Sequence, residues 1–121
     1  MTSPPAPTCV RDVRSYAGCI LVALCGEIDI HTAPGVTDCL DALTRSGDTD
    51  LLIDLRAVDF IDGAGVRVLD RARSRTSGRR GRMRLICTRR ATLRLLTHPR
   101  LRLGFDILSR LPAPTPPQAA A

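Results

Sequence analysis

The part of the chain best suited to chemistry is the short segment Asp62-Gly63-Ala64-Gly65. It follows an apolar strand pattern at residues 51–55 and precedes a helical pattern. An aspartate just before a helix can accept hydrogen bonds from the first backbone N–H groups, and glycines permit a tight turn. A helix start of this kind offers N–H groups to an anion or a protein. Its central alanine has a methyl group that can neither attack a substrate nor accept a phosphoryl group.

A second group of polar residues alternates along the chain at Glu27, Asp29 and His31. In an extended strand this spacing would place two carboxylates and one imidazole on one face, which are the donors of a metal site. The preceding strand is predicted to end near Gly26, and neither a second histidine nor a matching carboxylate pair lies nearby. We therefore expect no metal, no cofactor and no catalytic activity.

Anion or nucleotide binding at the glycines is an open alternative, with Arg67 holding the anion. Gly63 and Gly65 are not followed by the Gly-Lys-Ser/Thr sequence of a P-loop. We therefore interpret both glycines as conformational. Asp62 is interpreted as the cap of the following helix, and Asp29 as the residue that closes a turn.

The composition indicates one small domain with an uneven charge. The chain has 121 residues, and 44% hydrophobic content is enough for a single core. Residues 1–62 hold ten acidic residues and four arginines, whereas residues 63–121 hold two acidic residues and fourteen arginines. A basic half can attract nucleic acid or an acidic protein face. Because tryptophan is absent and only three Tyr or Phe residues occur, base stacking is not a main theme and nucleic acid is the less favoured partner.

The arginines of the basic half are expected on exposed surfaces. Arg67, Arg71 and Arg75 recur every four residues, which would line them along one side of a helix. Four more surround two glycines, where a turn and a strand start would leave them in water: Arg79, Arg80, Arg82 and Arg84.

The five cysteines form no C-x-x-C pair and no metal-binding spacing. Their odd number favours reduced thiols and hence a cytoplasmic protein. Most are expected to be small core residues, and redox sensing by Cys9 or Cys39 is a minor alternative. The N-terminus lacks the features of a signal peptide, and the longest apolar run, residues 17–26, is too short to cross a membrane.

Hydrophobic periodicity predicts strands and helices in alternation. Strands are expected over residues 10–16, 19–25, 51–55, 83–87 and 105–108. Helices are expected from Thr32, whose hydroxyl would cap the first one, to Ser46-Gly47, and over residues 64–76 and 91–97.

This alternation predicts an α/β fold with a mixed, mostly parallel sheet, an antiparallel N-terminal edge strand and packed helices. A single domain, residues 10–111, is expected between disordered tails at residues 1–9 and 112–121. In such sheets, ligands and partners bind beyond the carboxyl ends of the strands. Two loops, residues 26–32 and 59–65, are therefore expected to lie next to each other and to form the functional site.

Three strings of the sequence carry a resemblance to a known family. They are LCGEIDIHTAP at residues 24–34, LLIDLRAVDFIDGAGVRVL at residues 51–69 and GRMRLICTRRATLRLL at residues 81–96. In combination they resemble the STAS domain of bacterial anti-anti-sigma factors. That resemblance implies a non-catalytic protein that binds a serine-kinase-type anti-sigma factor and thereby releases a sigma factor.

In that family, phosphorylation of a serine or threonine at the start of the second helix breaks the complex. Ala64 is the matching position, in Asp-Gly-Ala-Gly where the family usually has Asp-Ser-Ser-Gly or Asp-Ser-Thr-Gly. The resemblance therefore implies a degenerate phosphorylation position, and a scaffold or accessory subunit of another signalling complex stays open. The implied partner-binding residues are Glu27, Asp29, His31, Thr32, Asp62, Gly63, Ala64, Gly65, Arg67 and Arg71.

Overall fold

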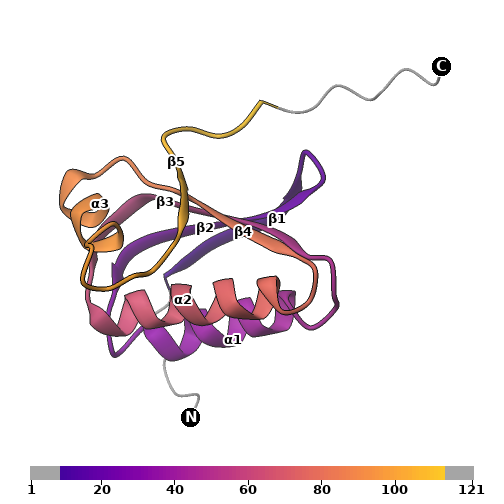
Figure 1. The fold of residues 1–121 in the computed structure, drawn as a ribbon, viewed down its shortest axis with the longest axis horizontal. Helices are drawn as coiled ribbons and strands as arrows, with labels where there is room; N and C mark the ends of the chain where they lie inside the picture. Colours follow the sequence, from indigo (N-terminus) through magenta and orange to yellow (C-terminus); the bar gives the residue numbers. More distant parts are fainter. Residues whose placement is uncertain (1–8, 114–121) are drawn as a thin grey trace, which may run out of the picture.

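A five-stranded sheet forms the frame of the molecule in the computed structural model, which describes residues 9–113 (Figure 1). The strands lie across the sheet in chain order, β1-β2-β3-β4-β5. They are β1 (Val10–Tyr16), β2 (Cys19–Ile28), β3 (Asp50–Ile61), β4 (Arg82–Ile86) and β5 (Asp106–Leu108). The helices are α1 (Ala33–Leu43), α2 (Gly63–Ser77) and α3 (Arg90–Leu96).

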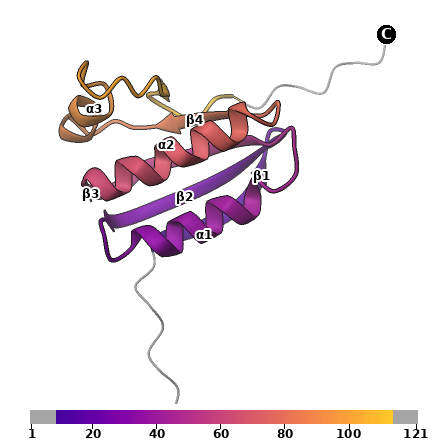
Figure 2. The ribbon, with the colours of Figure 1, turned by 60° about the horizontal axis from the view of Figure 1, so that its bottom comes forward.

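The pairing of the strands confirms the predicted fold class. β1 pairs with β2 in the antiparallel sense, and each later pair of neighbours is parallel. Each connection between parallel strands leads to the next strand in the same direction across the sheet. Connections of the same handedness therefore place their helices on the same face of the sheet. Figure 2 shows α1 and α2 next to each other on that face, and the two helices contact each other.

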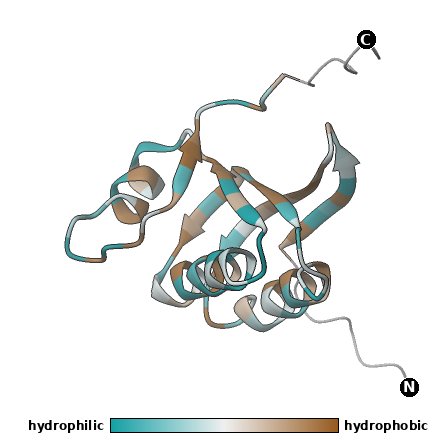
Figure 3. Ribbon diagram, turned by 45° about the vertical axis from the view of Figure 1, so that its right-hand side comes forward, coloured by the Kyte–Doolittle hydropathy of each residue, from teal (hydrophilic) through white to brown (hydrophobic). Residues whose placement is uncertain are grey.

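The main core fills the space between the sheet and this helix pair. Leu51, Ile53 and Leu55 alternate along β3 and are fully or almost fully buried against α2 residues such as Leu69 and Ala72. Figure 3 shows the corresponding alternation of hydrophobic and hydrophilic bands along strands and helices. Within residues 9–113, the helices are all too short or too polar to cross a membrane.

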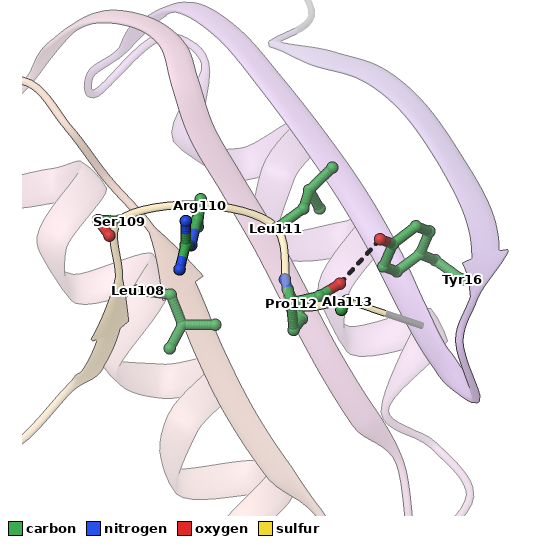
Figure 4. Close-up of a pocket in the computed structure, with 7 residues that line it drawn as sticks. All are labelled: Tyr16, Leu108, Ser109, Arg110, Leu111, Pro112 and Ala113. Carbon is green, nitrogen blue, oxygen red and sulfur yellow. Dashed lines mark hydrogen bonds between the residues drawn. The ribbon is translucent and has the colours of Figure 1, made fainter. Parts of the chain in front are cut away.

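The opposite face of the sheet carries a smaller apolar cluster, which explains why β2 is apolar on both faces. The segment after β5 crosses this face, and the Tyr16 hydroxyl donates a hydrogen bond to the Pro112 carbonyl oxygen at 2.8 Å (Figure 4). The cluster consists of Cys19, Leu21, Leu52 and Ile86, with Tyr16, Leu108 and Leu111 packed against it.

Two strands are longer than the sequence predicts. β2 continues past Gly26 to Ile28, and β3 continues past Leu55 to Ile61. The pairing of β2 with β3 shifts register twice, and each shift interrupts the alternation from which strands are recognised. Much of the expected loop at residues 59–65 is therefore the end of β3.

Residues expected at the tail boundaries contact the folded part of the chain. Cys9 is only 2% exposed, its thiol donates to the Glu27 carbonyl oxygen at 2.7 Å, and its own carbonyl accepts from the Cys25 N–H. A buried thiol of this kind is a core residue and not an accessible redox sensor. Pro112 accepts the hydrogen bond from Tyr16 described above. The rest of the two expected tails, residues 1–8 and 114–121, lies outside the described residues.

Two of the arginines expected in water make contacts within the fold; Arg79 is exposed as predicted, whereas Arg84 is not. Arg79 Nη1 donates to the carbonyl oxygens of Thr44 and Arg45 at 2.8 and 2.7 Å, and so satisfies the end of α1. The Arg84 side chain is only 11% exposed and its Nη2 lies 3.3 Å from Asp50 Oδ1. The pattern around the glycines did not reveal these acceptors because they lie more than thirty residues away in sequence.

Candidate functional site

Asp62 caps α2, as its position before the glycines predicts. Its Oδ1 accepts hydrogen bonds from the N–H groups of Ala64 at 2.9 Å and Gly65 at 3.1 Å. These N–H groups are therefore occupied within the protein. The alternative of an anion or nucleotide at this corner loses two of the donors on which it depends.

We expect Asp62→Ala to lower the free energy of unfolding by about 0.5–2 kcal/mol, because two N–H groups at the helix start lose their acceptor. Asp62→Asn keeps a side-chain oxygen at the same place and should lose much less. Urea unfolding followed by circular dichroism measures both variants. Equal losses for Ala and Asn would show that the cap is not the source of the effect.

The two glycines at the start of α2 have different roles. A Cβ atom on Gly65 would lie 2.5 Å from Ile61 Cγ1 and 2.7 Å from the Ile28 carbonyl oxygen, so this glycine lets α2 approach the ends of β2 and β3. A Cβ atom on Gly63 would meet nothing within 4 Å, and the left-handed φ values do not include Gly63. Neither glycine has a left-handed φ, so the conformational interpretation is wrong: Gly65 is needed because there is no room for a Cβ atom, whereas Gly63 is a place that a side chain could occupy.

The turn between β2 and α1 is organised by Asp29. Its Oδ1 accepts from the N–H groups of His31 at 2.9 Å and Thr32 at 3.1 Å. The pKa of Asp29 lies below its ordinary value, mainly because the carboxylate accepts the hydrogen bond from the Thr32 N–H. Asp29 thus closes the turn, as its sequence position predicts.

The expected hydroxyl cap by Thr32 is wrong. Thr32 Oγ1 accepts from the Asp29 N–H at 2.9 Å and donates to the Glu27 carbonyl oxygen at 2.8 Å, and it makes no capping hydrogen bond to α1. The hydroxyl faces back into the turn because the backbone of Thr32 is itself helical, with φ −93° and ψ −19°. Thr32 and Asp29 therefore fix the shape of the turn together.

The structure joins the two predicted segments. The Asp62 N–H donates to the Ile28 carbonyl oxygen at 3.2 Å, and Ile28 is the register partner of Ile61. The turn after β2 and the start of α2 consequently form one continuous surface, which we call the candidate site. Its residues are Glu27, Asp29, His31, Thr32, Asp62, Gly63, Ala64, Gly65 and Arg67.

Two exposed hydrophobic side chains next to this surface were not selected from the sequence. Ile30 is 70% exposed and Phe60 is 53% exposed. Phe60 precedes the buried Ile61 in the same strand, so alternation would have placed its ring on the outside. Exposed large side chains beside a polar turn are typical of a protein-binding surface.

Glu27, Asp29 and His31 line a shallow hollow of about 490 Å³ together with other residues of the turn and of β3. They do not form a metal-binding group: in residues 9–113, no cluster of three or more His, Cys, Asp and Glu side chains could hold a metal ion. Oδ1 of Asp29 already accepts hydrogen bonds from two backbone N–H groups. The hollow offers hydrogen-bonding groups to a partner.

The arginines of α2 differ in whether their side chains contact α1. Arg71 makes a two-point contact with Asp41 of α1, with N–O distances of 3.1 and 2.8 Å. Arg75 lies 3.4 Å from the same carboxylate, so these two arginines link α2 to α1. The Arg67 side chain is exposed and makes no ion pair or hydrogen bond with residues 9–113. Arg71, predicted to bind a partner, is thus already engaged within the protein.

The link between Arg71 and Asp41 predicts a dependence of stability on pH. The hydrogen bond from Arg71 is the main cause that lowers the pKa of Asp41 from its ordinary value of 3.8. Stability from this pair is therefore present above about pH 4 and is lost as the pH falls through the lowered pKa. We expect Asp41→Asn to reduce stability at about pH 6 and to make no difference at about pH 2.

Urea unfolding midpoints at these two pH values test this dependence. Asp38→Asn, an exposed change on the same helix, is the matched control. A loss for Asp41→Asn that stays the same at both pH values would contradict the role of the carboxylate charge.

Comparison with known proteins agrees with the fold. Residues 11–107 match the STAS domain. The chain belongs to the STAS domain family. A curated relative, the anti-sigma-F factor antagonist RsfB of Mycobacterium tuberculosis strain H37Rv, is 30% identical over 69 residues, which cover 57% of this chain and 55% of RsfB. The chain therefore spans about half the length of the curated relatives it matches.

Solved structures extend the likeness over most of this STAS domain. An anti-sigma factor antagonist from Mycobacterium paratuberculosis superposes with a TM-score of 0.72 at 27% identity, covering 82% of this chain and 84% of that one. The unphosphorylated antagonist SpoIIAA superposes with a TM-score of 0.66 at 14% identity, covering 83% and 88%; this match shows the fold alone. The protein is thus a STAS domain protein that resembles anti-sigma factor antagonists.

Proposed function

We propose that this STAS domain binds a serine-kinase-type anti-sigma factor through the candidate site and that phosphorylation at the start of α2 does not switch it. The observation that carries the proposal is Ala64 at the second residue of a well-capped α2, where antagonists of this type carry a hydroxyl. We further propose that it acts in the cytoplasm as a regulator without catalytic activity of its own.

The candidate site has the mixed chemistry of a protein-binding surface. Asp29 and Asp62 hold the two backbone segments in place through hydrogen bonds to N–H groups. Ile30, next to the site, supplies apolar contact area, and Arg67 supplies a cation whose side chain has no partner among residues 9–113. A preformed surface of this kind loses little conformational entropy on binding.

Ala64 is the position at which a covalent mark would act most strongly. It is partly exposed, and its N–H is already bonded to Asp62. A phosphoryl group would add about −1.5 to −2 charges and three acceptor oxygens. At a helix start that anion would leave the fold intact but would change the charge and shape of the binding surface. A methyl group keeps the surface in its binding form.

The test is capture of partners from the organism of origin with the full chain as bait, followed by incubation of the complex with ATP. The proposal expects a serine-kinase-type anti-sigma factor among the captured proteins and no phosphoryl transfer to the bait. Capture of a different signalling complex, without an anti-sigma factor, would favour the alternative of a STAS scaffold. A phosphorylated wild-type bait would contradict the proposal.

A further inference from the structure

A second surface lies between the end of β3 and α3, beyond the candidate site. It is a groove of about 180 Å³ whose lining is largely apolar. The ring of Phe60 is about half exposed at this place, which is unusual for a large aromatic side chain in a small domain. The lining residues are Asp59, Phe60, Ile61, Ala91, Thr92 and Leu95.

One wall of the groove is the exposed side of α3. Ala91 and Leu95 are one helical turn apart and face the groove. Arg90 and Arg94, also one turn apart, lie beside this pair on the exposed flank of the helix. Neither arginine makes an ion pair or side-chain hydrogen bond with residues 9–113, so both guanidinium groups are available.

The only acidic side chain in the lining is already neutralised. Asp59 Oδ1 lies 3.2 Å from Arg89 Nη2, and Arg89 Nε donates to the Val58 carbonyl oxygen at 3.3 Å. This contact fixes the start of α3 against the end of β3. From residue 71 to residue 105 the chain contains no aspartate or glutamate, so the α3 wall of the groove carries only positive charge.

We propose that this groove binds an acidic segment of a protein partner, which inserts an aliphatic or aromatic side chain between Phe60 and Leu95. Arg90 and Arg94 pair with carboxylates on either side of the inserted residue. The proposal goes beyond the proposed function, because it concerns a surface other than Ala64 and holds whether or not the partner is an anti-sigma factor.

The chemistry of the neighbouring residues favours a protein over a nucleic acid. Glu27 in β2 is the register partner of Phe60, and Glu27 and Asp29 line a hollow together with Asp59, so carboxylate groups lie on the β2 side of Phe60. A continuous phosphate backbone would meet these carboxylates, whereas a short acidic segment with an apolar residue can engage only the basic wall. The lining also holds a single aromatic ring, too few for successive bases to stack.

The experiment measures binding of a fluorescein-labelled acidic peptide with a central leucine to the full chain by fluorescence anisotropy. We expect saturable binding that weakens on the order of tenfold in Arg90→Glu/Arg94→Glu. Arg45→Glu/Arg80→Glu is the matched control: it changes the charge equally at exposed positions before β3 and β4, at the opposite end of the strands from the groove, and it should retain binding. Ala91→Tyr, which fills the groove without changing charge, should weaken binding too.

Peptide variants separate the two parts of the contact. Replacing the leucine by serine, or the glutamates by glutamines, should each weaken binding. If Arg90→Glu/Arg94→Glu and Arg45→Glu/Arg80→Glu weaken peptide binding equally, the attraction is a nonspecific effect of net charge and the proposal is overturned. The absence of peptide binding would also overturn it, as would tighter binding of a single-stranded oligonucleotide at the same salt concentration. Because no anti-sigma factor and no ATP are present, this result is independent of the test of the proposed function.

Discussion

Ala64→Ser is expected to turn an unswitched protein into one that its kinase partner controls. The serine hydroxyl would stand at the second residue of α2, where the backbone is held by Asp62 and the surface is partly exposed. Transfer of a phosphoryl group would place a dianion at the centre of the candidate site. Because misplaced charge in an interface costs several kcal/mol, we expect phosphorylation to weaken the complex on the order of 100-fold or more.

The measurement combines intact-mass analysis with binding of the anti-sigma factor before and after incubation with ATP. Unphosphorylated Ala64→Ser should bind about as well as the wild type, since a hydroxyl adds little bulk. Gly63→Ser is the control, because it adds the same hydroxyl one residue earlier, in open space. If Gly63→Ser is labelled as readily as Ala64→Ser, or if labelling leaves binding unchanged, the position of the switch is wrong.

Gly65→Ala is expected to cause the largest loss of stability from the addition of one methyl group at the site. The added Cβ would lie 2.7 Å from the Ile28 carbonyl oxygen, and a backbone atom in a paired strand cannot move aside as a flexible side chain can. Contacts with the Ile61 and Ile28 side chains would be equally close. We expect a loss of about 1–3 kcal/mol in the free energy of unfolding, as for other overpacked positions.

Gly63→Ala is the matched comparison, because the same atom added two residues earlier meets nothing within 4 Å. It should be neutral, or should stabilise the protein by up to about 1 kcal/mol through a less flexible unfolded chain. Urea unfolding measures both variants, and partner binding should weaken only for Gly65→Ala, as α2 is displaced from the strand ends. Similar stabilities for the two variants would contradict the close approach of α2 at Gly65.

Local signals were sufficient to predict most of the fold and the adjacency of the two segments that form the candidate site. The order of strands and helices follows from hydrophobic periodicity, and the cap at Asp62 follows from an aspartate in front of a helical pattern. The adjacency of the two site segments follows from the rule that parallel strands end at one edge of the sheet. In the structure, the hydrogen bond from the Asp62 N–H to the Ile28 carbonyl oxygen joins the two segments.

Features that depend on distant parts of the chain were not predictable in this way. The continuation of β3 to Ile61 is hidden by shifts in register with β2. The pairing of Arg71 with Asp41 joins residues on two helices, so helical spacing alone assigned Arg71 to solvent. Thr32 is a local exception: its side chain type fits a cap, but its hydroxyl bonds to the Asp29 N–H and the Glu27 carbonyl oxygen, a competition that the residue type alone does not decide.

The most direct test of the central claim is intact-mass analysis of the wild-type protein in complex with its anti-sigma factor during incubation with ATP. The account predicts that the complex persists and that the mass of this chain does not change, because position 64 holds a methyl group. Addition of a phosphoryl group to the wild-type chain, accompanied by dissociation of the complex, would contradict it.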